Sequence, residues 1–409
     1  KLLIRYFIQI KFQPKKIAYM DYKEVVKHEI NECSTELCDL AMFLHSNPET
    51  AYQEVKAHDY ITNYLERKNF KVERNFIHPT GFRATFETSS SPHFAILVEY
   101  DALPLIGHAC GHNIIAESSV AAAIGLKAAM EKGLKCKLSV LGTPAEEKGG
   151  GKIKFVTERI FDDIDLSIMS HPFNKNALYF YSLAVIGLRV TFTGKETHAS
   201  VLPWEGINAL DAAVLAYQSI SCLRQQMQPD FRIHGIISKG GTVPNIIPNL
   251  TEMEYNVRAP TVKLLKEFIP RVYDCFHGAA KMTHCEVNIV ETCNLYEDIL
   301  SNPTLLKVFE KNAISYGMSF EMPLETFRGS SDVGNVSHVC PTIHPVFTLG
   351  EDFMIHTKEF SIGSGTTKAV NAGILQGKIM SGTLIDILLD KDGNLLKNIK
   401  SDFQNQILN

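Results

Sequence analysis

Apolar runs and amphipathic stretches alternate along the first half of the chain. A helical pattern over residues 21–68 opens it. Three continuous apolar runs follow, at residues 94–100, 137–143 and 165–170. The alanine-rich stretch 114–133 between the first two runs has the length of a helix, with Asn113 as its expected N-cap and Gly133 as its stop. Buried apolar strands that alternate with helices predict a doubly wound α/β sheet.

A different pattern begins near Ala184. Strand-like segments occur at residues 184–194, 231–238, 251–259 and 284–292. Helical segments at 206–227 and 261–281 complete the order β-α-β-β-α-β, which is typical of a ferredoxin-like unit. We therefore predict an inserted α+β domain at residues 184–295, which divides the first domain into residues 20–183 and 296–409.

The first domain is expected to resume after the insertion. Its remaining elements are a helix, an apolar strand-like run and a closing helix, at residues 303–316, 343–350 and 366–389. The predicted fold is thus a doubly wound, mixed-sheet α/β domain with a ferredoxin-like insertion. Residues 1–19 contain no acidic residue, and we interpret them as a non-native or disordered extension ahead of Met20.

Composition excludes several classes of partner. The 409 residues carry 41 basic and 45 acidic side chains, so no basic excess favours nucleic acid or an anionic membrane. No apolar run has the length of a membrane span. The nine cysteines are scattered without the spacing of a disulfide framework, which favours a reducing compartment such as the cytoplasm.

Side chains that can bind a metal or transfer a proton follow the predicted strands. Ligands of doubly wound sheets bind just beyond the carboxyl ends of the strands. The sequence GHACGHN places Cys110 and His112 on either side of Gly111, so that one turn can aim both side chains at a single point. Thiolate and imidazole are typical zinc ligands. The alternatives are a free cysteine in a glycine turn and a thiol nucleophile with His112 as its base.

Two adjacent carboxylates follow the second apolar run. Neighbouring side chains of an extended segment point in opposite directions, so Glu147 can bind a metal while Glu146 handles a proton. The alternative is a solvated acidic loop. His171 follows the third run and His356 lies in a polar loop before the closing helix, and each alone fits a structural role. Together, metal-competent residues come from four separate segments: Cys110, His112, Glu147, His171 and His356.

Short motifs in a fixed order connect the chain to a known family. They are NPETAYQE (47–54), EYDALPLIGHACGHN (99–113), GTPAEE (142–147), SHP (170–172), GKETHAS (194–200), PNIIPN (244–249), NVRAP (256–260) and HTKEF (356–360). With them the chain resembles peptidase family M20 over about residues 22–390. More narrowly it resembles the amidohydrolase branch and, through EYDALP and CGHN, its eukaryotic dipeptidases. Asn113 departs from the aspartate of the wider branch, so it is not counted as a ligand.

The resemblance implies two divalent metal ions per chain. It assigns Cys110, His112 and His171 to one ion, and Glu147 and His356 to the other, with Cys110 as a candidate bridge. Zinc suits these ligands, and manganese and cobalt are the alternatives. Asp101 matches the aspartate that orients a ligating histidine.

The resemblance also implies the roles of further residues. Glu146 would be the general base of amide hydrolysis. His198 resembles a histidine that reaches into the partner subunit's site, which implies a homodimer through the inserted domain. Asn245 and Arg258 match positions that bind a substrate carboxylate, a role that suits the planar guanidinium. The loop 328–335 would supply backbone donors. For His108 the alternatives are a role near the site and a structural role.

The expected activity is therefore hydrolysis of dipeptides with a basic C-terminal residue, namely Lys, Arg or ornithine. As acidic partners for that residue Asp332 and Glu117 are considered, but the sequence favours solvated surface for both. An N-acyl amino acid amidohydrolase would use the same machinery. An inactive homologue that serves as a binding protein is a third hypothesis, against which the complete ligand set argues.

Overall fold

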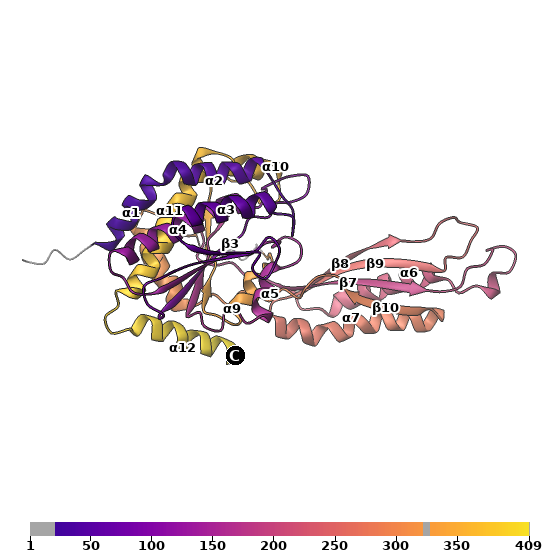
Figure 1. Cartoon of the computed structure of the whole chain (residues 1–409). Helices are drawn as coiled ribbons and strands as arrows, with labels where there is room; N and C mark the ends of the chain where they lie inside the picture. Colours follow the sequence, from indigo (N-terminus) through magenta and orange to yellow (C-terminus); the bar gives the residue numbers. More distant parts are fainter. Residues whose placement is uncertain (1–20, 322–327, 409) are drawn as a thin grey trace, which may run out of the picture.

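Two bodies of unequal size make up the chain: a broad α/β domain and a narrow inserted domain that extends from one side of it (Figure 1). The computed structural model describes residues 21–321 and 328–408. The predicted extension 1–19 lies outside the described residues. The mixed α/β class and the ferredoxin-like insertion are both confirmed.

The larger domain is built on a six-stranded sheet in the order β1-β2-β4-β3-β5-β11. Its strands are β1 (Lys71–Arg74), β2 (Phe82–Glu87), β3 (His93–Val98), β4 (Lys137–Gly142), β5 (Leu166–Ile168) and β11 (Thr342–Ile343). Strands β4, β3, β5 and β11 are parallel, whereas β1 and β2 are antiparallel additions at one edge. The three apolar runs of the first half are therefore neighbouring parallel strands, and their carboxyl ends meet at one edge.

Helices cover both faces of this sheet. Because side chains alternate along a strand, Phe94 and Ile96 face one layer while Ala95 and Leu97 face the other. The thicker layer contains α1 (Tyr22–Glu32), α2 (Ser34–Ser46), α3 (Val55–Arg67), α4 (His112–Glu131), α8 (Pro303–Ser315), α11 (Thr367–Leu388) and α12 (Asn394–Leu408). The opposite layer contains α5 (Gly151–Thr157) and α9 (Val333–Ser337).

Helix α4 lies at the centre of the thicker layer and is buried almost throughout. Its many alanines are strong helix formers that allow α11 to pack closely against it. The expected N-cap at Asn113 is wrong: Gly111 is the cap, in a left-handed conformation with φ of 79°. Asn113 instead lies in the first turn and donates from Nδ2 to the carbonyl of Ser364 at 2.9 Å. In the motif CGHN it is therefore the glycine that allows the chain to turn into α4.

The inserted domain has the predicted order of elements. These are β7 (Ala184–Thr193), the 3-10 turn η1 (Pro203–Glu205), α6 (Ala209–Leu223), the 3-10 turn η2 (Arg224–Gln226), β8 (Arg232–Lys239), β9 (Leu250–Ala259), α7 (Val262–Thr283) and β10 (Glu286–Glu291). The four strands form an antiparallel sheet in the order β10-β7-β9-β8. Helices α6 and α7 pack on one face and close a hydrophobic cluster that is separate from that of the larger domain.

The apolar run at 343–350 differs from the single strand that was expected. It forms two short strands, β11 and β12 (Val346–Thr348), because His344 and Pro345 interrupt the pairing. Strand β12 pairs in parallel with β6 (His171–Phe173), so the segment that begins at His171 is held beside the metal-binding edge. A short helix, α10 (Lys358–Ser364), follows the loop that carries His356.

Candidate metal centre

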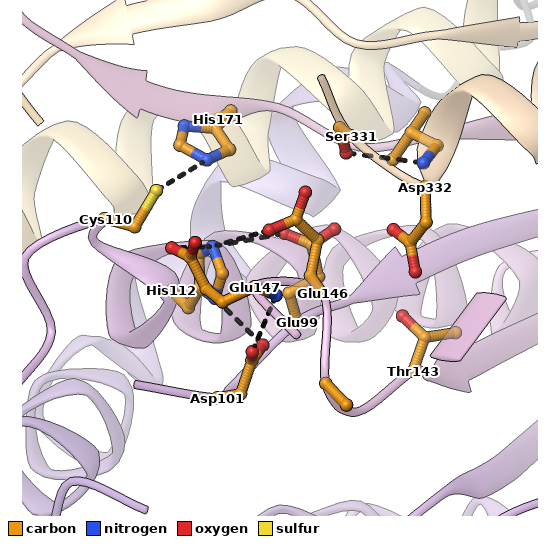
Figure 2. Close-up of polar contacts among 12 residues, drawn as sticks. Glu99, Asp101, Cys110, His112, Thr143, Glu146, Glu147, His171, Ser331 and Asp332 are labelled. Atoms are coloured by element: carbon orange, nitrogen blue, oxygen red, sulfur yellow. Dashed lines mark hydrogen bonds and ion pairs between the residues drawn. The ribbon is translucent and has the colours of Figure 1, made fainter. Parts of the chain in front are cut away.

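Side chains from four segments converge at the carboxyl edge of the parallel strands. Figure 2 shows three of these segments, through Cys110 and His112, Glu147, and His171. Cys110 and His112 stand at the start of α4, and His171 at the start of β6. The Cys110 sulfur lies 3.6 Å from His171 Nε2. In this group of three, one ligand atom from each residue lies within 4.8 Å of the others. The structure thus brings together the first predicted ligand group.

The second predicted group meets the first at the same place. Cys110, Glu147 and His356 also offer ligand atoms within 4.8 Å of one another. His356 Nε2 lies 3.3 Å from Glu147 Oε1. His356 has a positive φ of 65°, and its backbone N–H donates to the Ala109 carbonyl at 2.8 Å, which fixes its loop against the GHACGHN turn. Cys110 belongs to both groups, as a bridging thiolate would.

The expectation that Glu146 and Glu147 point in opposite directions is wrong. Both carboxylates approach His112 Nε2, at 4.0 Å and 3.9 Å respectively. The physical reason is that the pair lies in a turn and not on an extended segment. Ala145, with a φ of 62°, reverses the chain directly before the pair. Both carboxylates therefore face the same space.

Asp101 joins the two halves of the centre. Its Oδ1 lies 3.0 Å from His112 Nδ1, and its Oδ2 accepts the backbone N–H of Glu147 at 3.0 Å. Burial alone would lower the pKa of His112, but Asp101 and Cys110 outweigh it and raise that pKa well above its ordinary value. Because Asp101 holds Nδ1, Nε2 of His112 is turned toward the carboxylates, where a metal ion can take the place of its proton.

A buried charge network beneath the centre was not predicted. Lys152 on α5 donates to Glu99 Oε1 at 2.5 Å and to Asp332 Oδ1 at 2.7 Å, and all three side chains are fully buried. The other oxygen of Glu99, Oε2, lies 3.6 Å from His112 Nε2. Burial raises the pKa of Glu99, but Lys152 and the nearby histidines together outweigh it and lower that pKa to about 2. A lysine inside the glycine-rich stretch GGGKIK was the available signal.

Several further residues named from the sequence lie outside the ligand groups, and some are not in the environment that was predicted for them. Asp332 is paired with Lys152 and Glu117 is fully buried in α4, so solvated surface is wrong for both. His108 is buried, which lowers its pKa to about 3, and its carbonyl accepts from Ser364 Oγ at 3.0 Å. In the loop 328–335, Ser330 Oγ accepts from Arg258 at 2.8 Å. Arg258 thus lies where the inserted domain meets this loop.

His198 and Asn245 lie elsewhere. They occupy the loops that follow β7 and precede β9, at the end of the inserted domain farthest from the larger domain (Figure 1). Both are exposed. The two loops are joined, since Ala199 N–H donates to the Asn245 carbonyl at 2.9 Å. Within one chain the structure does not bring these two residues to the metal-binding edge.

The donor set fits a divalent metal ion. His112 Nε2 and Glu147 Oε1 are buried and have no hydrogen-bond partner among the described residues. Unpartnered buried polar atoms are costly, and a cation between them would satisfy both. Thiolate, imidazole and carboxylate together are the ligand types of zinc-like ions.

Comparison with known proteins agrees with the fold. Residues 184–280 match the peptidase dimerisation domain of M20 proteins. The Xaa-Arg dipeptidase of Mus musculus is 41% identical over 398 residues, which are 93% of this chain and 92% of that protein. The fold and the site thus define a metallohydrolase with an inserted dimerisation domain. The chain belongs to peptidase family M20.

Solved structures share the fold at low sequence identity. A putative aminohydrolase from methicillin-resistant Staphylococcus aureus has a TM-score of 0.76 at 18% identity, over 90% of this chain and all of that chain. A dinuclear metal-binding peptidase of family M20 from Bacillus subtilis has a TM-score of 0.68 at 18% identity, over 87% of this chain and 99% of its own. Among the described residues, no helix is both long and apolar enough to cross a membrane.

Proposed function

We propose that this protein hydrolyses the amide bond of dipeptides with a basic C-terminal residue, in a reaction that depends on two divalent metal ions. The observation that carries the proposal is the convergence of both ligand groups on His112 Nε2 and Glu147 Oε1, two buried atoms that have no hydrogen-bond partner among the described residues. The 41% identity to a protein named Xaa-Arg dipeptidase supports the dipeptide and its basic residue.

The metal ligands are assigned by their grouping. Cys110, His112 and His171 would hold one ion, and Glu147 and His356 the other, with Cys110 shared between them. When bound, such a pair supplies Lewis acidity that polarises the amide carbonyl and makes a water molecule more acidic. We propose zinc as the native metal because of the thiolate and imidazole donors, with manganese and cobalt as alternatives.

Glu146 is the proposed general base. Burial raises its pKa well above the ordinary carboxyl value, and Glu99 and Glu147 raise it further. A raised pKa suits a group that accepts the proton of the attacking water and then returns it to the leaving nitrogen. Glu146 also lies against the ligand group, since its carboxylate is 4.0 Å from His112 Nε2.

The substrate carboxylate is assigned to Arg258 and Asn245. Arg258 is half-buried at the junction of the two domains, where its guanidinium can bind a carboxylate in a bidentate way. Asn245 and His198 are on the far loops, which follow β7 and precede β9, so they would act in the site of a second chain, which supports a homodimer. All nine cysteines are free, which supports a reducing compartment such as the cytoplasm.

Metal analysis combined with a substrate panel tests the proposal. Protein purified without chelator should contain about two equivalents of transition metal per chain. It should cleave dipeptides that end in Lys, Arg or ornithine faster than those that end in Ala or Glu, and chelator should abolish the cleavage. Preference for N-acetyl amino acids would instead support the N-acyl amino acid amidohydrolase. A metal-free protein that cleaves none of these amides would refute the proposal.

A further inference from the structure

The chain crosses between the two domains twice, and the crossings pair with each other. The outgoing chain enters the inserted domain at Val185, the second residue of β7, and the returning connection contains Tyr296. Val185 N–H donates to the Tyr296 carbonyl at 2.9 Å, and Tyr296 N–H donates back at 3.0 Å. Tyr296 therefore occupies the junction about which the inserted domain is oriented.

The returning connection also contacts the turn that carries Glu146. The Tyr296 hydroxyl donates to the Glu146 carbonyl oxygen at 2.7 Å. Two residues earlier, Asn294 Nδ2 donates to the Gly149 carbonyl at 2.7 Å. The Tyr296 ring packs on Gly150 so closely that a Cβ there would lie 2.8 Å from it. The junction and the turn therefore form one packed unit.

Side chains hold three successive residues of this turn in place. Glu54 Oε1 accepts the N–H of Ala145 at 2.9 Å, and Asp101 Oδ2 accepts the N–H of Glu147 at 3.0 Å. Between them, the Glu146 carbonyl is held by the Tyr296 hydroxyl. Glu54 and Asp101 belong to the larger domain, so Tyr296 is the member of this set that comes from the connection to the inserted domain.

We propose that Tyr296 is a positioning residue for Glu146, and that through it the orientation of the inserted domain controls the placement of the general base. The inference rests on the proposed function, in which Glu146 handles the proton. It follows from geometry: the phenol fixes the peptide group of the base, and the same residue's backbone is fixed to Val185. Small errors in the placement of a catalytic group can lower the rate by up to about 100-fold.

The test is the variant Tyr296→Phe in the metal-loaded protein. The change removes the hydroxyl but keeps the ring on Gly150 and the backbone pair with Val185. We expect kcat for a dipeptide substrate to fall roughly 10- to 100-fold, while KM and bound metal per chain stay at wild-type values. A crystal structure of the variant should show the Glu146 carboxylate displaced relative to His112.

A matched control comes from Tyr64, a buried tyrosine whose hydroxyl also donates to a neighbouring oxygen, Glu36 Oε2 at 3.2 Å. Tyr64→Phe should leave kcat unchanged. As a second variant, Asn294→Ala removes the contact with Gly149 at an exposed position, and we expect a smaller loss of kcat with normal folding.

The outcomes separate the inference from the proposed function. If the wild type is active and Tyr296→Phe retains its kcat, the inference is refuted alone. Equal losses of kcat in the Tyr296 and Tyr64 variants, or a loss matched by loss of bound metal, would also refute it, because both indicate general destabilisation. A metal-loaded wild type that cleaves no amide would refute the proposed function and the inference with it.

Discussion

The metal-binding edge and the far end of the inserted domain both carry candidate site residues, but they hold them in opposite ways. At the edge, His112 and Asp101 are 0% and 1% exposed and each is fixed by a short polar contact. At the far end, His198 is exposed, and its Nδ1 is contacted by the neighbouring Ser200. A buried, interlocked group is organised by its own chain, whereas an exposed one acquires a defined geometry only against another surface.

At the metal-binding edge, loss of the general base Glu146 should have the largest effect on kcat. Glu146→Gln keeps the shape of the side chain but abolishes its basicity, so kcat should fall about 10²–10⁴-fold. Bound metal should remain, because Glu146 is outside the two ligand groups proposed here. Steady-state kinetics and elemental analysis measure both. Glu158→Gln, on the exposed end of α5, is the control. Full activity of the Glu146 variant would contradict its role.

Residues at the far end of the inserted domain should affect activity only through the site of a second chain. His198→Ala should lower kcat by about 10²–10³-fold, as expected for loss of a group that stabilises the developing oxyanion. If His198 serves the partner's site, co-expression with the Glu146→Gln chain should restore activity to about a quarter of the wild type, since half the dimers then contain one intact site. Activity should not be restored when the two variants are purified separately and their subunits do not exchange. An absence of restoration after verified exchange would place His198 in its own chain's site.

Charge pairs in the two regions should differ in their contribution to stability. Lys152→Met leaves Glu99 and Asp332 buried without their cation and should lower the free energy of unfolding by about 3–5 kcal/mol. Lys195→Met breaks the exposed pair with Glu205, at 3.6 Å, near the far end and should cause no measurable change. Urea unfolding of both variants gives the comparison. Similar stabilities would show that the buried network is dispensable.

A third carboxylate, that of Glu117, is as buried as Glu99 but is not paired with a cation in the part of the chain that the structure describes. Neither oxygen of Glu117 has a hydrogen-bond partner among the described residues, and burial raises its pKa well above 4.5. The folded state therefore binds this proton more tightly than the unfolded state, so stability falls as the pH rises above about 4.5. Glu117→Gln should match the wild type near pH 5 and become increasingly more stable toward pH 8 in thermal unfolding. A difference in stability between the variant and the wild type that does not change with pH would contradict the raised pKa of Glu117.

Much of the fold could be predicted because the pattern of the sequence is local. The three apolar runs needed no distant information to be recognised as strands, and the alternation of Met253, Tyr255 and Val257 indicated a half-buried strand of the insertion. The ligand set could be collected in the same way, because each member directly follows or flanks such an element. Their convergence then follows from the rule that parallel strands end at one edge.

The rest depended on contacts between distant segments. Nothing near Lys152 in the sequence indicates that Asp332 pairs with it, because the pair joins α5 to the loop before α9. The common direction of Glu146 and Glu147 depends on the left-handed conformation of Ala145, a residue that rarely adopts it. Tyr296 was overlooked for the same reason, since its hydroxyl is defined by a contact across 150 residues.

The separate cores of the two domains have a consequence for synthesis of the chain. The core of the insertion is made by residues 184–280 together with hydrophobic side chains of β10 and up to Leu295, so it can form as soon as residues 184–295 have left the ribosome. Helix α4 of the larger domain packs against α11, which begins only at Thr367. The order of folding is therefore inverted relative to the order of synthesis: the domain whose translation begins first is completed last. Until then the surface of α4 that packs against α11 remains uncovered in the nascent chain, although α1 and α2 can already pack against the same helix.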